Sequence, residues 1–206
     1  MNEVTKKAFR LLREVKSVSC ATINKGEPVI RIADVMLAGE DGLYFLTARG
    51  KPYYKQLKEN HRLAICGMDK NYVSARIVGE IQFCGDRNIV DRIFQHNPMM
   101  NDLYPGEKRD ILEAFQMYRG KGEIFDLSVE PPGRERFSFG GETVNPSGYL
   151  ITDKCTACGI CLESCPVGAI SEGDVYVYKI DGSHCLECGR CAEVCPESAI
   201  QSSPGI

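Results

Sequence analysis

Residues 155–166 read CTACGICLESCP, and residues 185–196 read CLECGRCAEVCP. Both stretches follow one pattern, C-x2-C-x2-C-x3-C-P, and the second begins 30 residues after the first. Other residues recur at the same offset: Gly159 and Gly189, Glu163 and Glu193, Ala169 and Ala199, and Ile170 and Ile200. Eight of the 11 cysteines therefore belong to an internal repeat.

The spacing is that of an iron–sulfur ligand run, in which three thiolates hold one [4Fe–4S] cluster and the fourth crosses over to the other. Three closely spaced thiolates can bind three corners of a cubane from one turn, whereas the fourth corner needs a ligand from another direction. The proline that follows ends the turn. We therefore expect two ligand sets, Cys155, Cys158, Cys161 and Cys195 for cluster one, and Cys185, Cys188, Cys191 and Cys165 for cluster two.

Two other uses of the cysteines compete with this interpretation. Zinc sites also contain C-x2-C pairs, but a zinc ribbon needs four ligands in two pairs and not two sets of four. A disulfide framework is typical of exported proteins, and the N-terminus MNEVTKKAFRLLREVK lacks the apolar run of a signal peptide. Iron–sulfur clusters explain the duplicated pattern best.

From about Ser147 onward the chain resembles a two-cluster bacterial ferredoxin. The resemblance implies a small α+β domain at residues 149–206, preceded by a glycine-rich linker at 141–148 and a separate domain at 1–140.

Composition restricts the function classes. Hydrophobic residues make up 43% of the 206 residues and charged residues 26%, as in ordinary globular proteins. Residues 147–206 have a net charge of −5 and residues 1–146 one of +2, so no basic surface for nucleic acid is expected. The acidic segment could steer a basic redox partner or simply keep a small domain soluble. Nowhere do about 18 apolar residues follow one another, so we expect a cytoplasmic protein without a membrane span.

The first 140 residues predict a mainly β domain with flanking helices. Apolar residues at helical spacing, charges and turn residues give the following elements: helices at 3–16, 52–60, 86–96 and 108–118, strands at 17–23, 29–37, 43–47, 62–68, 72–84, 123–129 and 134–139, and a loop at 97–106. Seven short strands with few helices favour a barrel.

This order resembles the FMN-binding split barrel of the pyridoxamine 5′-phosphate oxidase-like family. The most telling segment is 44–60, YFLTARGKPYYKQLKEN, in which a strand ends at Thr47, a basic loop follows, and a helix ends at Asn60. Arg31 on the preceding strand also fits the family pattern. The resemblance implies a homodimer that holds FMN at its interface. The chain departs from the pyridoxamine phosphate oxidases after the last strand, because residues 134–141 lead into the linker and not into a segment for the substrate phosphate. Vitamin B6 oxidation is therefore in doubt.

Physical chemistry points to the same flavin site. Pro52 favours the first turn of a helix, and the free amides and positive dipole end of that turn attract phosphate. Lys51 and Arg31 could bind the phosphate, and the Thr47 hydroxyl could donate to the phosphate or the ring. Tyr54 and Gln56 could line the flavin or simply pack the helix. Arg49 and Lys55 are weaker candidates, for which solvent is the better interpretation.

Several other residues have a structural and a functional interpretation. Arg76, Gln82, Phe137 and Phe139 could meet a flavin ring from a partner subunit, although the phenylalanines fit a core better. Cys20, Cys66 and Cys84 are expected to be buried and inert. His184 precedes Cys185 and could tune a cluster, but a plain loop residue is the simpler interpretation; His61 and His96 share no ligand spacing with it.

These patterns favour a flavo-iron–sulfur oxidoreductase that passes electrons between two [4Fe–4S] clusters and FMN. Its expected partner is a ferredoxin, a flavodoxin or a reductase. Two other hypotheses remain open: a ferredoxin-type carrier whose barrel only docks partners, and a redox sensor or flavin-storage protein without turnover. No glycine-rich dinucleotide fingerprint supports direct NAD(P)H binding. The sequence names neither a substrate nor a catalytic acid or base.

Overall fold

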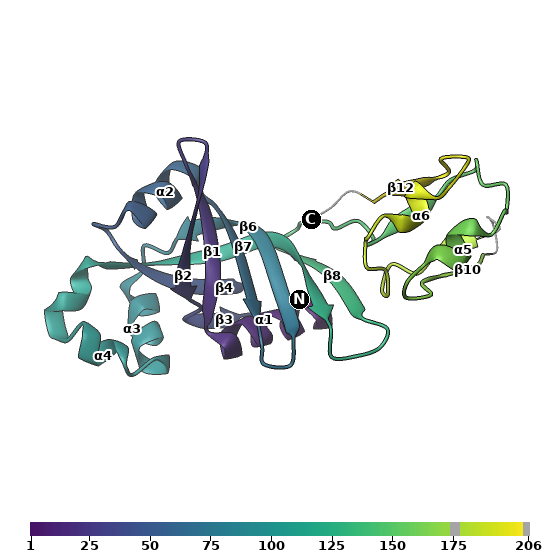
Figure 1. Cartoon of the computed structure of the whole chain (residues 1–206). Coiled ribbons are helices and arrows are strands. Elements are labelled where there is room, and N and C mark those ends of the chain that lie inside the picture. The colour runs from purple at the N-terminus through teal and green to yellow at the C-terminus, as the bar shows by residue number, and fades with distance from the viewer. Residues whose placement is uncertain (174–177, 204–206) are drawn as a thin grey trace.

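An antiparallel sheet curls into a barrel in the N-terminal two thirds of the chain (Figure 1). The computed structural model describes residues 1–173 and 178–203. The barrel strands are β1 (Ser17–Asn24), β2 (Glu27–Asp34), β3 (Leu37–Gly39), β4 (Gly42–Ala48), β5 (Arg62–Met68), β6 (Val73–Phe83), β7 (Leu112–Asp126) and β8 (Gly133–Phe139). They are ordered β2-β1-β5-β6-β7-β4-β3, and β8 pairs with β7. The predicted mainly β fold is confirmed.

Helix α1 (Glu3–Val15) covers the interior of the barrel. The Asn2 side chain caps it by accepting a hydrogen bond of 2.8 Å from the Thr5 amide. Ala8, Phe9 and Leu12 recur at helical spacing, are fully or almost fully buried, and join the core formed by the inward residues of the strands. The N-terminal helix expected at residues 3–16 therefore exists, and its apolar face packs against the sheet.

Helix α2 (Pro52–Asn60) connects β4 to β5 and packs against β1 and β4. Pro52 occupies its first turn, as expected, and His61 ends it in a left-handed conformation with φ of 52°. Helices α3 (Arg87–His96) and α4 (Met100–Leu103) pack on the outer side of β4 and β7 in a second apolar cluster that includes Val90, Ile93 and Phe94.

The helix predicted at 108–118 is wrong. This region forms a short 3-10 helix, η1 (Gly106–Ile111), and the first half of β7, which is 15 residues long. Four successive side chains of β7, Ala114 to Met117, are buried, because the barrel core covers one face and α3 covers the other. A strand covered on both faces loses the apolar–polar alternation that reveals strands in a sequence. Of the predicted strand at 123–129, residues 123–126 form the end of β7 and residues 127–129 lie outside any strand, and the barrel has eight strands instead of seven.

The C-terminal segment forms two interlocked halves. Strand β9 (Tyr149–Ile151) pairs with β12 (Ile200–Ser202), and β10 (Ile170–Glu172) pairs with β11 (Tyr178–Ile180), while α5 (Ile160–Ser164) and α6 (Arg190–Glu193) lie beside each other. The first strand of the region therefore pairs with the last. Of the residues expected in this domain, 174–177 and 204–206 lie outside the described residues.

No helix within residues 1–173 and 178–203 is both long and apolar enough to cross a membrane.

Candidate functional site: two cysteine cages and a polar cluster beside α2

The structure brings the cysteines together in the two sets that the crossover pattern predicts. Cys155, Cys158, Cys161 and Cys195 line one cavity, and Cys165, Cys185, Cys188 and Cys191 line a second. In each cavity three thiols come from one copy of the repeat and the fourth from the other. Neither cavity could be formed by one copy alone.

The backbone repeats as closely as the sequence. Gly159 and Gly189 both have φ of +80°, where an added Cβ would be strained. The amides of Ala169 and Ala199 donate to the Sγ atoms of Cys165 and Cys195, each at 3.3 Å. Amide donors to sulfur stabilise a thiolate and tune a bound cluster.

The competing uses of the cysteines fit the geometry less well. All 11 cysteines lie among the described residues and none forms a disulfide. Within the part of the chain that the structure describes, no three His, Cys, Asp or Glu side chains stand close enough to hold a single metal ion. Tetrahedral zinc requires four thiolates at about 2.3 Å from one centre, whereas a cubane spreads its four ligands over four iron atoms. A cavity lined by four cysteines, three from one copy of the repeat and one from the other, suits such a cluster.

Burial affects the thiols deepest in the two cavities. Cys161 and Cys191 are buried. Burial raises the pKa of the Cys191 thiol to about 11, and it also raises the pKa of the Cys161 thiol. In the absence of a cluster these two ligands are protonated at neutral pH. Uptake of a cluster would therefore release their protons.

A polar cluster lies where β2 meets α2. Arg31 donates from its two terminal nitrogens to the Thr22 hydroxyl at 2.8 Å and to Gln56 Oε1 at 2.7 Å, and its guanidinium lies 4.4 Å from the centre of the Tyr53 ring. Tyr53 also shares a hydrogen bond of 3.1 Å with the buried Cys20 thiol. Burial raises the pKa of both groups, so both are neutral at physiological pH. Arg31 is held in place by neutral groups and its charge is not cancelled by these contacts.

Thr47 supplies an observation that favours a ligand here. Its side chain is 3% exposed, and its hydroxyl has no hydrogen-bond partner. A buried polar group without a partner is rare in folded proteins and calls for an explanation. Thr47 shares its face of β4 with Phe45, toward the barrel interior and near the end of the strand from which α2 follows. A ligand that accepts this hydroxyl proton would satisfy it.

The other predicted flavin residues are distributed around α2. Lys51 and Lys55 are exposed, and Lys51 occupies the position before the helix without a side-chain cap. Tyr54 packs edge-on against Phe83. Gln56 is buried and accepts hydrogen bonds from both Thr22 and Arg31. The donor set fits a phosphorylated flavin, because two exposed lysines and a hydrogen-bonded arginine lie near the N-terminal end of one helix.

Three of the secondary expectations can now be judged. Phe137 and Phe139 belong to the barrel core, as expected. Cys20 is buried, but Cys66 is exposed and Cys84 is half-buried, so the prediction of three buried cysteines is wrong for Cys66. Leu63, Ile65 and Gly67 point inward from β5 and thereby turn Cys66 outward. Gln82 donates to Gln116 Oε1 at 2.9 Å.

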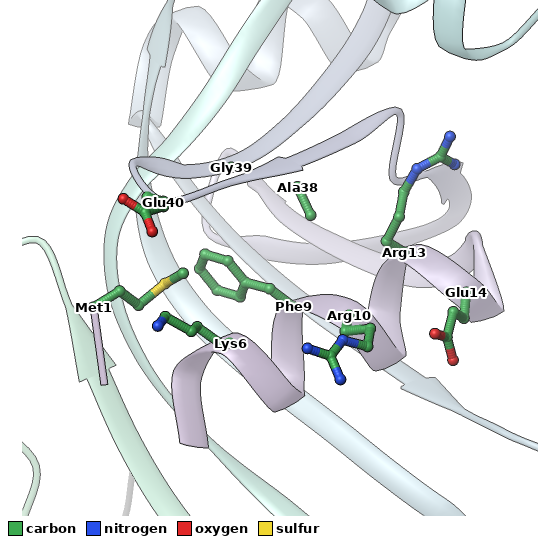
Figure 2. A pocket seen from close by; sticks show the side chains of 9 residues that line it. All are labelled: Met1, Lys6, Phe9, Arg10, Arg13, Glu14, Ala38, Gly39 and Glu40. Atoms are coloured by element: carbon green, nitrogen blue, oxygen red, sulfur yellow. The ribbon is translucent and has the colours of Figure 1, made fainter. Parts of the chain in front are cut away.

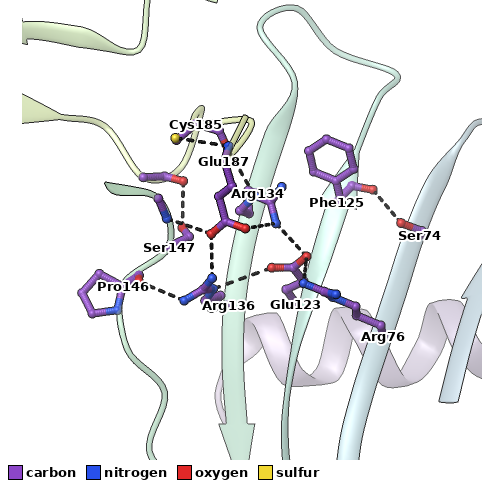
Figure 3. Close-up of polar contacts among 12 residues, drawn as sticks. Ser74, Arg76, Glu123, Phe125, Arg134, Arg136, Pro146, Ser147, Cys185 and Glu187 are labelled. Atoms are coloured by element: carbon purple, nitrogen blue, oxygen red, sulfur yellow. Dashed lines mark hydrogen bonds and ion pairs between the residues drawn. The ribbon is translucent and has the colours of Figure 1, made fainter. Parts of the chain in front are cut away.

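Sequence reasoning missed an ion network that joins the barrel to the cysteine domain (Figure 3). Glu123 on β7 is paired with Arg76, Arg134 and Arg136, and Arg134 and Arg136 are also paired with Glu187, which lies between Cys185 and Cys188. The side chains of Glu123, Arg134 and Arg136 are only 5–7% exposed. The pairing of Arg76 with Glu123 follows from the register of β6 and β7, but the contact with Glu187 spans two domains and has no local signal.

A surface cavity of about 500 Å3 lies elsewhere, between α1 and the turn at Glu40 (Figure 2). Figure 2 shows Met1 and Phe9 on its apolar side and charged side chains of α1 around it. The nine residues that line it include none of the predicted site residues. The cavity is therefore separate from the candidate site.

Comparison with known families assigns the barrel. Residues 4–118, more than half of the chain, match the family model described as pyridoxamine 5'-phosphate oxidase. The chain belongs to the pyridoxamine 5'-phosphate oxidase family. Residues 154–199 match the model of the 4Fe-4S dicluster domain. This member of the family therefore carries an iron–sulfur domain, and the predicted fusion is confirmed.

Ferredoxins are similar to the second part. The chain is 64% identical to a ferredoxin of Butyribacterium methylotrophicum over 28 residues, which cover 14% of this chain and 51% of that protein. It is 58% identical to a ferredoxin of Acetivibrio thermocellus over 33 residues, which cover 16% and 58%. The chain spans little more than half the length of these ferredoxins.

Solved structures share the fold of the first part. A NimC/NimA family protein of Clostridium acetobutylicum is 24% identical with a TM-score of 0.59, and the match covers 66% of this chain and 93% of that one. General stress protein 26 of Bacillus anthracis is 10% identical with a TM-score of 0.53, covering 66% and 100%. These likenesses support the fold of the pyridoxamine 5'-phosphate oxidase family, a split barrel.

Proposed function

We propose that the protein is a flavo-iron–sulfur oxidoreductase that passes electrons between two [4Fe–4S] clusters and a bound FMN. The observation that carries the proposal is the ion network of Glu123, Arg134, Arg136 and Glu187, which holds a cysteine loop of the iron–sulfur domain against the barrel. A domain that served only as a separate carrier would gain nothing from buried charges at this contact, which cost free energy unless they are fully paired. The cluster ligands in the proposal are the two sets of four cysteines described above.

The residues around α2 would hold the FMN. Arg31 and Lys51 would neutralise its phosphate, with Lys55 nearby, and the Thr47 hydroxyl would donate its unpartnered proton to the flavin or to the phosphate. Gln56 fixes the Arg31 side chain, and Tyr54 would border the site. Bound FMN supplies the exchange of an electron pair or a hydride with a substrate, whereas each cluster passes one electron at a time.

The arrangement in one chain favours a dimer. In Figure 1, α2 and the iron–sulfur domain lie on opposite sides of the barrel. The outer face of β2 exposes Ile30 and Ile32, and apolar residues that gather on one face are typical of an interface. We propose a homodimer in which the clusters of one subunit serve a flavin near the other subunit, with an external ferredoxin, flavodoxin or reductase as the redox partner.

We divide the chain as residues 1–140 for the barrel, 141–148 for the linker and 149–206 for the iron–sulfur domain. We place the protein in the cytoplasm, where reducing conditions keep thiols free for cluster assembly.

The distance between α2 and the iron–sulfur domain within one chain also favours a second candidate function, a ferredoxin-type carrier whose barrel docks partners without flavin. The same purification tests both. Protein isolated without oxygen should contain about eight iron and eight sulfide per chain and one FMN, and it should elute as a dimer. Clusters without flavin would favour the carrier, and stoichiometric zinc without sulfide would refute the iron–sulfur assignment.

Rapid mixing tests the relay itself. After mixing with a one-electron donor, cluster absorbance should bleach before the flavin is reduced, and the second phase should not depend on protein concentration. Cys165→Ser should remove cluster two and slow flavin reduction, whereas Cys66→Ser, which changes an exposed cysteine outside the repeat, should leave both phases unchanged. Flavin reduction that is equally fast in all three proteins would show that the clusters are not its relay.

A further inference from the structure

The two copies of the cysteine repeat carry different residues at a position where their backbones agree. Ala157 and Glu187 each follow the first cysteine of their motif by two residues, and both have positive φ, 64° and 55°. Such a conformation is uncommon for residues other than glycine, and nothing in it favours a glutamate over an alanine. The difference between the two copies must therefore come from what surrounds them.

The partners of Glu187 belong to the barrel and the linker. Its Oε1 accepts hydrogen bonds from Arg136 at 2.6 Å and from the Gly148 amide at 2.9 Å, and its Oε2 lies 3.3 Å from Arg134 (Figure 3). The Glu187 side chain is 26% exposed, so these charge-assisted contacts are partly shielded from water. Ala157, in contrast, is exposed, as is its neighbour Thr156.

Arg134 extends the contact along the same loop. Its backbone amide donates to the Ser183 carbonyl at 2.7 Å, and its Nε donates to the Cys185 carbonyl at 3.2 Å. Together with the pairs to Glu187, strand β8 holds the loop at three alternate residues, 183, 185 and 187. This loop carries the first two expected ligands of cluster two.

The charge of Glu187 compensates buried charges of the barrel. Arg134 and Arg136 are almost completely buried, and within the barrel they share one carboxylate, Glu123, which also pairs with the more exposed Arg76. Buried charges need compensation by nearby groups of opposite sign. Glu187 supplies a second carboxylate, so the iron–sulfur domain adds a negative charge to a network to which the barrel contributes three arginines and one glutamate.

We propose that Glu187 is a positioning residue that locks the loop of cluster two, and not that of cluster one, against the barrel. Cluster two is then the cluster nearest the barrel, and cluster one faces the external donor. The order of the two clusters in electron transfer rests on the proposed function, whereas the docking of the loop does not.

Cys66 provides a native reporter for this docking. Its thiol is exposed on β5, and together with Arg76, Leu186 and Glu187 it lines a cavity of about 400 Å3 between the barrel and the loop of cluster two. In the cluster-loaded protein near pH 8 a nitroxide reagent should label Cys66 selectively, because the motif cysteines are occupied, Cys20 is buried, and burial raises the pKa of the half-buried Cys84 thiol to about 11. A paramagnetic reduced cluster that is close to the label shortens its electron spin relaxation time.

The experiment compares this relaxation in the labelled, reduced holoprotein and its variants. Glu187→Ala gives the second loop the residue of the first, and the relaxation enhancement should fall severalfold as the loop leaves the barrel. Glu187→Gln keeps one acceptor and should recover part of it. Glu197→Gln, which removes an exposed carboxylate two residues after a cluster-one cysteine, should change nothing. An enhancement that is the same in Glu187→Ala as in the unaltered protein would overturn the role of Glu187.

A pair of ligand variants tests which cluster is near. Cys165→Ser, which affects cluster two, should abolish the enhancement, whereas Cys195→Ser, which affects cluster one, should preserve it. The opposite result would place cluster one at the barrel and refute the proposal. None of these measurements involves FMN, so a protein without flavin would refute the proposed oxidoreductase and leave the docking result intact.

Discussion

Replacing Glu123 by glutamine removes the carboxylate at the centre of the ion network. The Glu123 side chain is 5% exposed, and its partners Arg134 and Arg136 are 7% and 5% exposed, so water cannot easily solvate the two guanidinium groups. Removing one partner of a buried ion pair costs about 3–5 kcal/mol, because the remaining charge stays buried without compensation. Glutamine retains one acceptor oxygen and Glu187 remains in place, so we expect a loss of about 3 kcal/mol.

This loss should be visible in thermal and urea unfolding. For a chain of this size, about 3 kcal/mol corresponds to a fall in Tm of roughly 6–12 °C. The chain contains no tryptophan, so near-UV circular dichroism of the tyrosines, measured without oxygen on the cluster-loaded protein, is a suitable signal.

Glu135→Gln is the matched control. Glu135 lies on the same strand as the two arginines, but its side chain is 43% exposed and pairs with Lys7, which is 51% exposed. Exposed pairs contribute about 0–1 kcal/mol, so this variant should unfold almost as the unaltered protein does. If Glu123→Gln costs no more than Glu135→Gln, the network is not stabilised in the way that its burial implies.

Three other outcomes follow from the geometry. Lys51→Ala and Arg31→Ala should each weaken FMN binding at least tenfold, since each removes a charge-assisted contact of about 1.5–3 kcal/mol; unchanged affinity in both, by calorimetry, would place the flavin elsewhere. Gly148→Ala should reduce the iron retained by cluster two, because an added Cβ would lie 3.1 Å from Cys185 Cβ. Gly141→Ala is the control, because Gly141 has a similar φ but an added Cβ there would meet no atom within 4 Å. Equal iron contents in the two variants would refute this steric argument. Burial raises the pKa of the Cys84 thiol to about 11, so the rate of its alkylation, measured by mass spectrometry, should rise about tenfold per pH unit up to that value. At pH 8 Cys84 should react more slowly than the exposed Cys66. Faster labelling of Cys84 at pH 8 would contradict the burial of its thiol.

The sequence predicted those features whose signals are local. The cysteine spacing predicted which thiols share a cavity, and Pro52 predicted the start of α2. The apolar spacing of α1 predicted a packed helix. The two helices depend on residues within a few turns, and the thiol sets depend on a spacing that the sequence repeats.

The features that sequence reasoning missed depend on tertiary context. The sequence predicts a helix at residues 112–118, where the structure has a strand. Both faces of β7 are covered at this point, so the sequence lacks the alternation of apolar and polar residues that indicates a strand. Cys66 was assigned to the interior, although its neighbours in β5 turn it outward. The pairing of Glu123 and Glu187 around two arginines joins residues more than 60 positions apart. Only the packing of two domains brings these charges together, and no local sequence pattern predicts this contact.

The position of β7 in the sheet has a consequence for how the chain folds during synthesis. Strand β7 lies between β6 and β4, so strands made earlier form two separate groups, β2-β1-β5-β6 and β3-β4, whose facing edges have no partner until residues 112–126 leave the ribosome. Late pairing of distant strands is slow, and open edges invite association with other chains. The barrel can close only after Asp126, and β8, which holds the cluster-two loop, adds to β7 next. The iron–sulfur domain thus emerges after β8, onto a surface completed just before it.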